Sequence, residues 1–341
     1  PQFQRPNFKF SGRKSPLALT VGILVIIGAA FTALSGFYAD WLWFKSVNFT
    51  STWSTVLGTK ALLFVVVGLV TALFIMLNVL VAYKRRPLYV PMTVEADNLE
   101  RYRAQIQPIR RAVFIAGFLA LFYFAGSSGS TLWSTWLLFK NSTEFGVTDP
   151  QFNMDISFFA FRLPFWQTAI GWGISTLVLA IIASVAVHYL YGGIRLQVRE
   201  DRTTVAARVQ LSVLLGLVVL LKAVAYWFDR YALALKDSKL ITGLTYTDVN
   251  AVLPAKAILT GIAVVCALLF FANIVRRSWV LPAAGTALLV ISSVLIAGLY
   301  PAAIQTFQVK PSESSKEAEF IQRNIDATRA AYGLEDVTVS D

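Results

Sequence analysis

Seven charge-poor apolar stretches, each near twenty residues long, constrain this chain more than any other feature. A helix needs about 20 apolar residues to cross the roughly 30 Å hydrocarbon core of a bilayer. The stretches therefore predict an all-α integral membrane protein, a bundle of about seven transmembrane helices. The expected spans are residues 17–39, 61–83, 112–130, 166–191, 209–228, 257–275 and 279–300.

The composition agrees with a membrane protein. Hydrophobic residues make up 56% of the chain and charged residues 14%, whereas a soluble domain carries about 25% charged residues. We expect three parts: a basic cytoplasmic tail over residues 1–15, a seven-span membrane domain over 16–300, and the start of an extracytoplasmic region over 301–341. We expect that last region to be truncated.

The formal charge of +11 could indicate nucleic-acid binding, but its distribution indicates membrane topology. With the N-terminus in the cytoplasm, seventeen arginines and lysines fall on the inner side and eight fall in the outer loops between spans. Such a bias is typical of cytoplasmic loops. We therefore expect a multi-pass cell (plasma) membrane protein with an extracytoplasmic C-terminus and no nucleic-acid partner. Anionic lipid headgroups are the expected partners on the cytoplasmic side.

A short amphipathic helix is expected on the cytoplasmic face between spans two and three. Pro108 should end it before span three. Its apolar side chains follow helical spacing: Leu99, Tyr102, Ile106 and Ile109.

A second helix is expected in the extracytoplasmic region after span seven. Ser314 with Glu317 forms a capping-box pattern, and Gly333 could supply a left-handed C-terminal cap. Its apolar stripe, which includes Phe320 and Tyr332, has nothing after it to cover it. This pattern predicts a chain that continues into a further domain or docks on a partner protein.

Two outer segments between spans have distinctive sequences. Gly126 to Ser130 is a glycine-serine cluster, which predicts a helix end or a break. Residues 140–165 hold a short aromatic stretch, which we expect to pack on the outer ends of the spans as an extended or partly helical segment.

Lys222 and His188 are candidate functional residues within the spans. An intramembrane cation is costly and is a functional candidate by default. Lys222 could line a polar cavity, or snorkel past Tyr226 to the interface, and Asp229 could help to neutralise it. His188 could relay protons or be a hydrogen-bonded interface histidine.

Asp149 and Asp155 are the candidates outside the spans. They could supply oxygen ligands to calcium, but their spacing lacks a dense carboxylate pattern, and Asp149-Pro150 is also a turn initiator. The single cysteine, Cys266, and the single histidine exclude an intrachain disulfide and any multi-histidine site. No phosphate-cradling loop or nucleophile elbow is present. We therefore expect no catalytic, cofactor-binding or metal site.

The stretch from Asp149 to Phe165, DPQFNMDISFFAFRLPF, is similar to the "DP.F..D..F..F.LP" signature of an uncharacterised bacterial multi-pass membrane protein family. That family is number 0182 in the uncharacterised-protein-family series. Residues 40–44 and 309–334 also resemble it, although Ser312 replaces the usual asparagine and residues 318–320 depart from the pattern. The resemblance implies about seven N-terminal spans, a large extracytoplasmic region after them, and no established activity.

These observations favour a protein that anchors an extracytoplasmic domain and acts as a scaffold or subunit of a membrane complex, and not an enzyme. Two alternatives stay open. One is a transporter or channel with Lys222 lining a polar cavity. The other is an enzyme whose active site lies in a missing C-terminal region.

Overall fold

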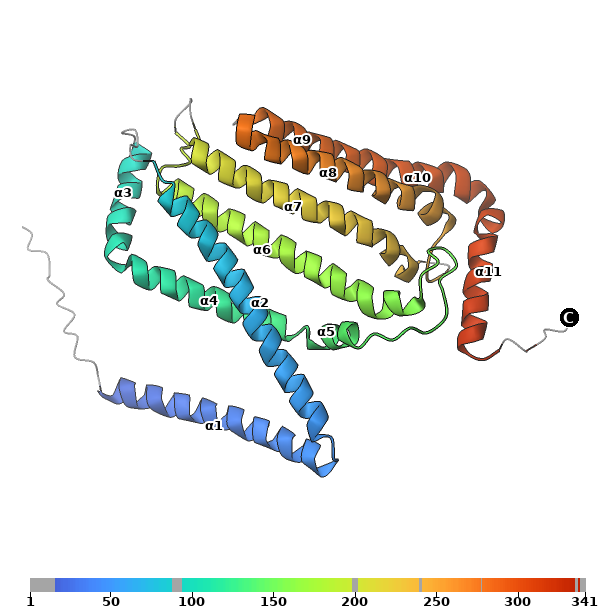
Figure 1. Cartoon of the computed structure of the whole chain (residues 1–341), viewed down its shortest axis with the longest axis horizontal. Coiled ribbons are helices and arrows are strands. Elements are labelled where there is room, and N and C mark those ends of the chain that lie inside the picture. The colour runs from blue at the N-terminus through green and yellow to red at the C-terminus, as the bar shows by residue number, and fades with distance from the viewer. Residues whose placement is uncertain are drawn as a thin grey trace, which may run out of the picture. The chain divides into compact units, whose positions relative to one another are not determined.

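The computed structural model describes residues 16–87, 94–197, 202–238, 241–276, 278–334 and 337 (Figure 1). Within these residues every regular element is helical, and the only β-pairings are isolated bridges. Seven helices there are long and apolar enough to cross a membrane. The predicted all-helical class and the seven apolar helices are therefore confirmed. The basic tail over residues 1–15 lies outside the described residues.

The chain divides into two compact units, residues 1–61 and 62–341. In the first unit, α1 (Pro16–Ser46) leads through a tight turn into the start of α2 (Thr50–Lys84). Asn48 in this turn has a positive φ of 61°, a conformation that asparagine tolerates better than most residues. Phe37 and Trp53 pack edge to face, with ring centroids 4.9 Å apart. This aromatic contact joins the two helices beside the turn.

The second unit holds the rest of α2 and all later elements. Its later α-helices are α3 (Val94–Ile106), α4 (Arg110–Ser130), α5 (Trp133–Lys140), α6 (Leu163–Leu190), α7 (Val205–Ala232), α8 (Leu253–Arg276), α9 (Val280–Ser292), α10 (Tyr300–Ile304) and α11 (Glu313–Ala331). Short 3-10 helical turns are η1 (Gln107–Ile109), η3 (Leu233–Leu235) and η7 (Lys310–Ser312). Short π-helical turns are η2 (Phe158–Arg162), η4 (Asp248–Val252), η5 (Ser293–Leu299) and η6 (Gln305–Val309).

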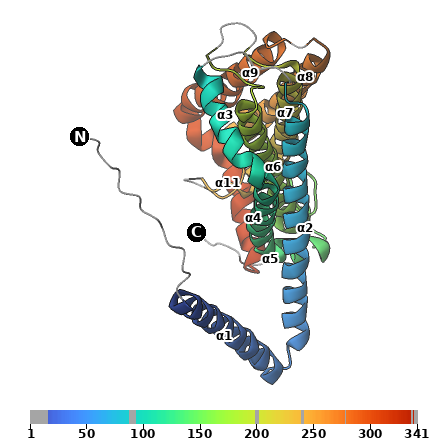
Figure 2. The ribbon, with the colours of Figure 1, turned by 90° about the vertical axis from the view of Figure 1, so that its left-hand side faces the viewer.

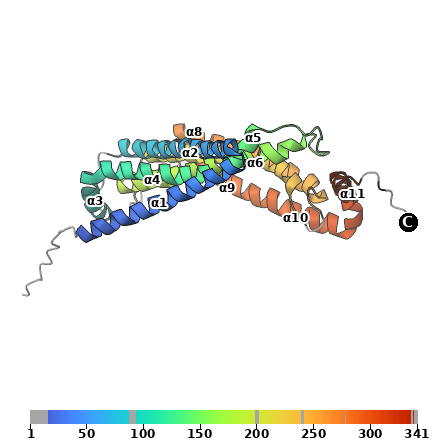
Figure 3. The same ribbon diagram turned by 90° about the horizontal axis from the view of Figure 1, so that it is seen from below.

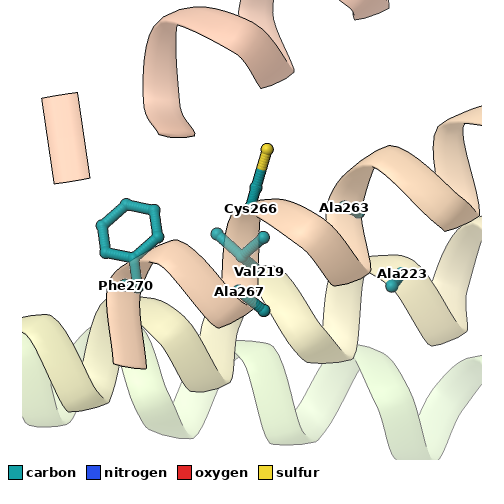
Figure 4. Close-up of a cluster of buried hydrophobic side chains, with 6 residues drawn as sticks. All are labelled: Val219, Ala223, Ala263, Cys266, Ala267 and Phe270. Carbon is teal, nitrogen blue, oxygen red and sulfur yellow. The ribbon is translucent and has the colours of Figure 1, made fainter. Parts of the chain in front are cut away.

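Helices α6, α7, α8 and α9 pack side by side in chain order (Figure 1). Small side chains at the interfaces let the backbones approach closely. Between α7 and α8, Ala223 packs with Ala263 and Ala267. Val219, Cys266 and Phe270 complete the same buried cluster (Figure 4). Close packing of small residues, rather than large apolar side chains, therefore forms much of this interface.

The glycine-serine cluster forms the last five residues of α4, which ends at Ser130, so the predicted helix end is confirmed. The glycines do not break the helix. A Cβ atom at Gly126 would lie 2.7 Å from the carbonyl oxygen of Phe64, and one at Gly129 would lie 2.5 Å from Cβ of Val67. Both distances are too short for a real side chain. The cluster therefore marks the place where α4 meets α2, not an irregular backbone.

The last span runs on beyond its predicted end at residue 300. From Val280 to Ala331 the chain is helical, interrupted by π-helical turns at η5 and η6. Pro301 is the second residue of α10, just after η5 ends at Leu299, so its missing N–H group removes one backbone hydrogen bond without ending the helix. The chain then turns sharply into α11, beyond the end of α10 (Figures 1 and 3).

The expected amphipathic helix between spans two and three is present as α3, which lies across one end of the helices of the second unit (Figure 2). We call this end the α3 end, and the opposite end the α11 end. Arg103 and Ile106 are half-buried, whereas Tyr102 is 61% exposed and Ile109 is 55% exposed. Within the predicted stripe, Leu99 and Ile106 are thus partly covered by the second unit, whereas Tyr102 and Ile109 are not.

Candidate functional site

The α11 end gathers several carboxylates that bind backbone N–H groups. They lie in α11 itself and in the loops between α5 and α6 and between α7 and α8. We call these three segments the α11 platform: residues 141–157, residues 233–238 with 241–248, and α11.

Asp149 organises the first loop of the platform. Its Oδ1 atom accepts hydrogen bonds from the N–H groups of Gln151 (3.0 Å) and Phe152 (2.7 Å). The backbone N–H of Asp149 donates to the carbonyl oxygen of Met154 at 2.8 Å. This is the pattern of an Asx turn. Asp149 therefore acts as the turn-forming residue that its sequence also indicated.

Asp155 closes the same loop. Its carboxylate accepts the backbone N–H groups of Phe145 (3.1 Å), Gly146 (2.9 Å) and Ser157 (2.8 Å). Hydrogen bonds from Ser157, helped by those from Phe145 and Gly146, lower the pKa of Asp155 to about 2. The charged form is therefore the one that holds the loop. In the described part of the chain, no three metal-ligating side chains lie together.

Aromatic side chains attach this loop to the helices. The rings of Phe152 and Phe158 lie 5.2 Å and 5.3 Å from the ring of Tyr231 in α7. Phe165 stacks on Phe139 of α5 at 4.0 Å. The aromatic stretch that carries the family resemblance therefore packs against helix ends, as expected, and much of it is helical because α6 is preceded by η2.

Asp248 fixes the second loop. Its carboxylate accepts the N–H (3.1 Å) and the hydroxyl (2.8 Å) of Thr245, and the Thr245 oxygen lies 3.3 Å from the N–H of Asp248. These reciprocal bonds form a capping box at the start of the helix that becomes α8. Lys236 also pairs with Asp248, at 2.7 Å, and the Asp248 side chain is only 1% exposed.

Helix α11 docks on both loops through polar contacts. The carboxylate of Glu317, 3% exposed, accepts the backbone N–H of Tyr246 at 3.0 Å. The side-chain amide of Asn324 donates to the carbonyl oxygen of Thr242 at 2.8 Å. Arg323 donates to the side-chain oxygen of Gln151 at 3.2 Å. One face of α11 is thus held by this chain.

These contacts correct the prediction for the C-terminal helix. Phe320 is buried and lies beside Tyr246, so part of the stripe expected to be uncovered is covered. Tyr332 stays 76% exposed. The predicted capping box is absent, since Ser314 lies inside α11 and Glu317 binds Tyr246 instead. Gly333 does adopt the left-handed conformation, with φ of 64°.

His188 lies near the α3 end, 1% exposed, in a network that joins α2, α6 and α7. Its Nε2 atom is 3.0 Å from Oε1 of Gln210. The Gln210 amide nitrogen donates to the carbonyl oxygen of Asn78 at 2.9 Å and lies 3.2 Å from the hydroxyl of Ser184. This orientation of Gln210 assigns the ring proton to Nε2. The contacts are those of a hydrogen-bonded interface histidine.

Lys222 is half-buried in α7, and its amine lies 4.8 Å from the ring centroid of Tyr226. Asp229 does not neutralise it, because Asp229 pairs with Lys256 of α8 at 3.4 Å. The structure therefore brings Asp149 and Asp155 together in one loop, but places His188 and Lys222 in separate surroundings.

Sequence reasoning missed Asp248 as a structural centre of the platform and mistook the role of Glu317. For Asp248 a signal existed, since the Thr-x-x-Asp spacing before an apolar run is a capping-box pattern. For Glu317 there was none, because its partner is a backbone N–H group 71 residues away in the sequence.

In its described residues the chain is thus helical, with seven helices long and apolar enough to cross a membrane and the α11 platform at one end of the second unit. The chain belongs to the Uncharacterised protein family (UPF0182), whose model matches residues 17–341. The resemblance noted in the sequence is thereby confirmed.

Several UPF0182 proteins are close relatives. One from Streptomyces coelicolor is 47% identical over 336 residues, which cover 97% of this chain and 34% of that protein. One from Thermobifida fusca is 47% identical over 334 residues, 96% of this chain and 32% of the relative. The chain thus spans about a third of the length of these relatives. No solved structure matches it.

Proposed function

We propose that this chain is the membrane anchor of a larger protein. Its seven apolar helices cross the bilayer, the N-terminus is cytoplasmic, and the α11 platform is extracytoplasmic. In this proposal the protein acts as a scaffold or subunit of a membrane complex, and the platform carries or contacts the extracytoplasmic part.

One observation carries the proposal: the second unit buries several polar side chains between its helices while it exposes many large apolar ones. Ser184, Ser212 and Asn273 are fully buried, and Asn273 donates to Ser212 at 2.7 Å between α8 and α7. Phe124 is 72% exposed and Leu268 is 60% exposed. In water such a surface would be an aggregation liability. In lipid it is the expected arrangement, because the tails are as apolar as leucine.

The charge distribution supports the orientation. Basic residues concentrate at the α3 end, where α2 finishes and α4 starts, and such residues favour the cytoplasmic side. The relatives' greater length supports the anchoring role, since two thirds of each lies outside the matched part. The Lys222 amine lies over the ring of Tyr226, a contact that favours the anchoring role over transport through Lys222.

Cysteine labelling in intact cells tests this orientation. Cys266 is the only cysteine, so Cys266→Ala gives a background without thiols. Single cysteines are then placed at Ser15, Asn98, Glu144 and Glu313. A membrane-impermeant maleimide is expected to label Glu144→Cys and Glu313→Cys, and to label Ser15→Cys and Asn98→Cys only after permeabilisation.

Labelling of all four variants after permeabilisation is the control for reactivity. If Ser15→Cys and Glu313→Cys were labelled from the same side of the membrane, an odd number of crossings would be excluded. The same side for Asn98→Cys and Glu144→Cys would exclude α4 as a span.

A further inference from the structure

Three arginines surround two tyrosines at the α3 end. They line a pocket of about 270 Å³, which we call the arginine pocket. Its residues come from the end of α2, from α3 and the turn after it, from the start of α4 and from the residue after α6: Tyr83, Arg86, Pro87, Arg103, Gln107, Arg110 and Tyr191. A water molecule takes about 30 Å³ of liquid, so the pocket has room for a group of several heavy atoms.

The two tyrosine rings hold the guanidinium groups in place. They pack edge to face with centroids 5.1 Å apart. The guanidinium carbon of Arg86 lies 4.3 Å from the centroid of Tyr83, and that of Arg103 lies 5.8 Å from the centroid of Tyr191. Arg110 donates to the Tyr83 hydroxyl at 2.7 Å. Three positively charged side chains therefore contact the same pair of tyrosines.

Among the described residues, no carboxylate forms an ion pair with these arginines. The ion pairs among the described residues join Lys236 with Asp248, Lys256 with Asp229 and Arg323 with Glu319, and none includes an arginine of the pocket. Like charges gathered in one pocket repel one another. Without a counter-ion the cluster would cost free energy, so its composition indicates an anionic ligand.

Arg103 provides an independent indication. Its Nε atom donates to the carbonyl oxygen of Leu190 at the end of α6, which is a favourable place for a cation. Its Nη2 atom, however, is buried and has no hydrogen-bond partner. A buried donor left unsatisfied costs about 1–3 kcal/mol, and more when it is charged. An acceptor oxygen in the pocket would remove this cost.

We propose that the arginine pocket binds a phosphate group. Arginine matches phosphate because its planar fork can donate two parallel hydrogen bonds to neighbouring oxygens. The phosphate can belong to an anionic lipid headgroup or to a free phosphate. The lipid source rests on the proposed membrane anchor, which places the ends of α2 and α6 at the cytoplasmic interface. The free-phosphate source does not depend on the proposed membrane anchor.

A charge-matched pair of double variants tests the site in the purified full chain. Arg86→Gln/Arg110→Gln removes two arginines of the pocket. Arg85→Gln/Arg111→Gln removes their exposed sequence neighbours, which do not line it. Binding of phosphatidylglycerol and of phosphatidylcholine is measured by native mass spectrometry in detergent. In a second arm, millimolar inorganic phosphate is added and the thermal unfolding midpoint is followed.

The pocket variant is expected to bind phosphatidylglycerol roughly 100-fold more weakly than the unsubstituted chain, because two charge-assisted hydrogen bonds are lost. The neighbour variant should stay within about fivefold. A lipid source gives this difference with no effect of phosphate. A free-phosphate source gives a phosphate-dependent rise of the midpoint in the unsubstituted chain and the neighbour variant only.

Equal loss of binding in both double variants would overturn the proposal, since general surface attraction would then explain it. So would a chain that neither prefers phosphatidylglycerol nor responds to phosphate. Should the pocket variant not fold, Arg86→Lys/Arg110→Lys keeps the charge and loses the forked geometry. It should bind about tenfold more weakly than Arg85→Lys/Arg111→Lys, and equal binding of the two would overturn the proposal.

Discussion

Replacing Gly68 and Gly126 together by alanine is expected to destabilise the chain by about 4 kcal/mol, the largest effect we anticipate from adding two methyl groups. A Cβ atom at Gly68 would lie 2.7 Å from the carbonyl oxygen of Phe122, and one at Gly126 equally close to that of Phe64. Both obstacles are backbone atoms, which cannot rotate away. Helices α2 and α4 would therefore have to move apart along the interface where they pack. The gain in helix propensity, about 1 kcal/mol per glycine replaced, offsets only part of the cost.

The matched control is Gly171→Ala/Gly261→Ala, in α6 and α8. Nothing lies within 4 Å of a Cβ atom at either position, so this variant should be as stable as the unsubstituted chain or slightly more so. Thermal unfolding midpoints in one detergent compare the two. Equal unfolding midpoints for the Gly68→Ala/Gly126→Ala variant and the control would show that α2 and α4 do not pack this closely.

Asp248→Ala is expected to give the second largest effect, a loss of about 3 kcal/mol. The buried carboxylate binds Lys236 and two donors of Thr245, and its removal leaves them without an acceptor. We take the low end of the range for a broken buried pair because the Lys236 side chain is 45% exposed and can turn to water. The capping box at the start of α8 is lost as well.

Asp229→Ala is the control for this change, since it removes another aspartate that pairs with a lysine. Its partner Lys256 lies farther away, at 3.4 Å, and both side chains are partly exposed. That variant should lose less than about 1 kcal/mol. Thermal unfolding in detergent measures both, and hydrogen exchange across residues 241–252 locates the change. An Asp248→Ala variant no less stable than Asp229→Ala would contradict the role assigned to the capping box.

The number of apolar helices could be predicted from sequence because lipid imposes a length that hydropathy reads directly. The ends of the helices could not. Span two was expected to start at residue 61, yet α2 starts at Thr50. The residues before 61 are more polar, so they are helical without lengthening the apolar stretch from which the span was predicted. The extension of the last apolar helix past residue 300, through α10 and η6 to Val309, was missed for a related reason. Proline usually signals a helix end, but at Pro301 the preceding π-helical turn accommodates it.

For the candidate residues, local roles could also be predicted from sequence and long-range pairings could not. Local chemistry could be predicted: Asp149 initiates a turn, and Gly333 adopts the left-handed conformation. Pairings between distant segments could not, since helical spacing gives no information about neighbouring helices. Asp229 faces Lys256 of α8 rather than Lys222 on its own helix. Glu317 likewise finds its partner, Tyr246, in a loop that only the fold brings near.

Washing membranes from expressing cells with alkaline carbonate tests most directly whether lipid surrounds these helices. Carbonate strips proteins that are bound to a membrane surface and leaves those that cross the bilayer. With Phe124, Leu268 and the other large apolar side chains facing outward, the chain should sediment with the washed membranes and leave them only on addition of detergent. Recovery of the chain in the carbonate supernatant, folded and without detergent, would contradict the membrane-spanning arrangement.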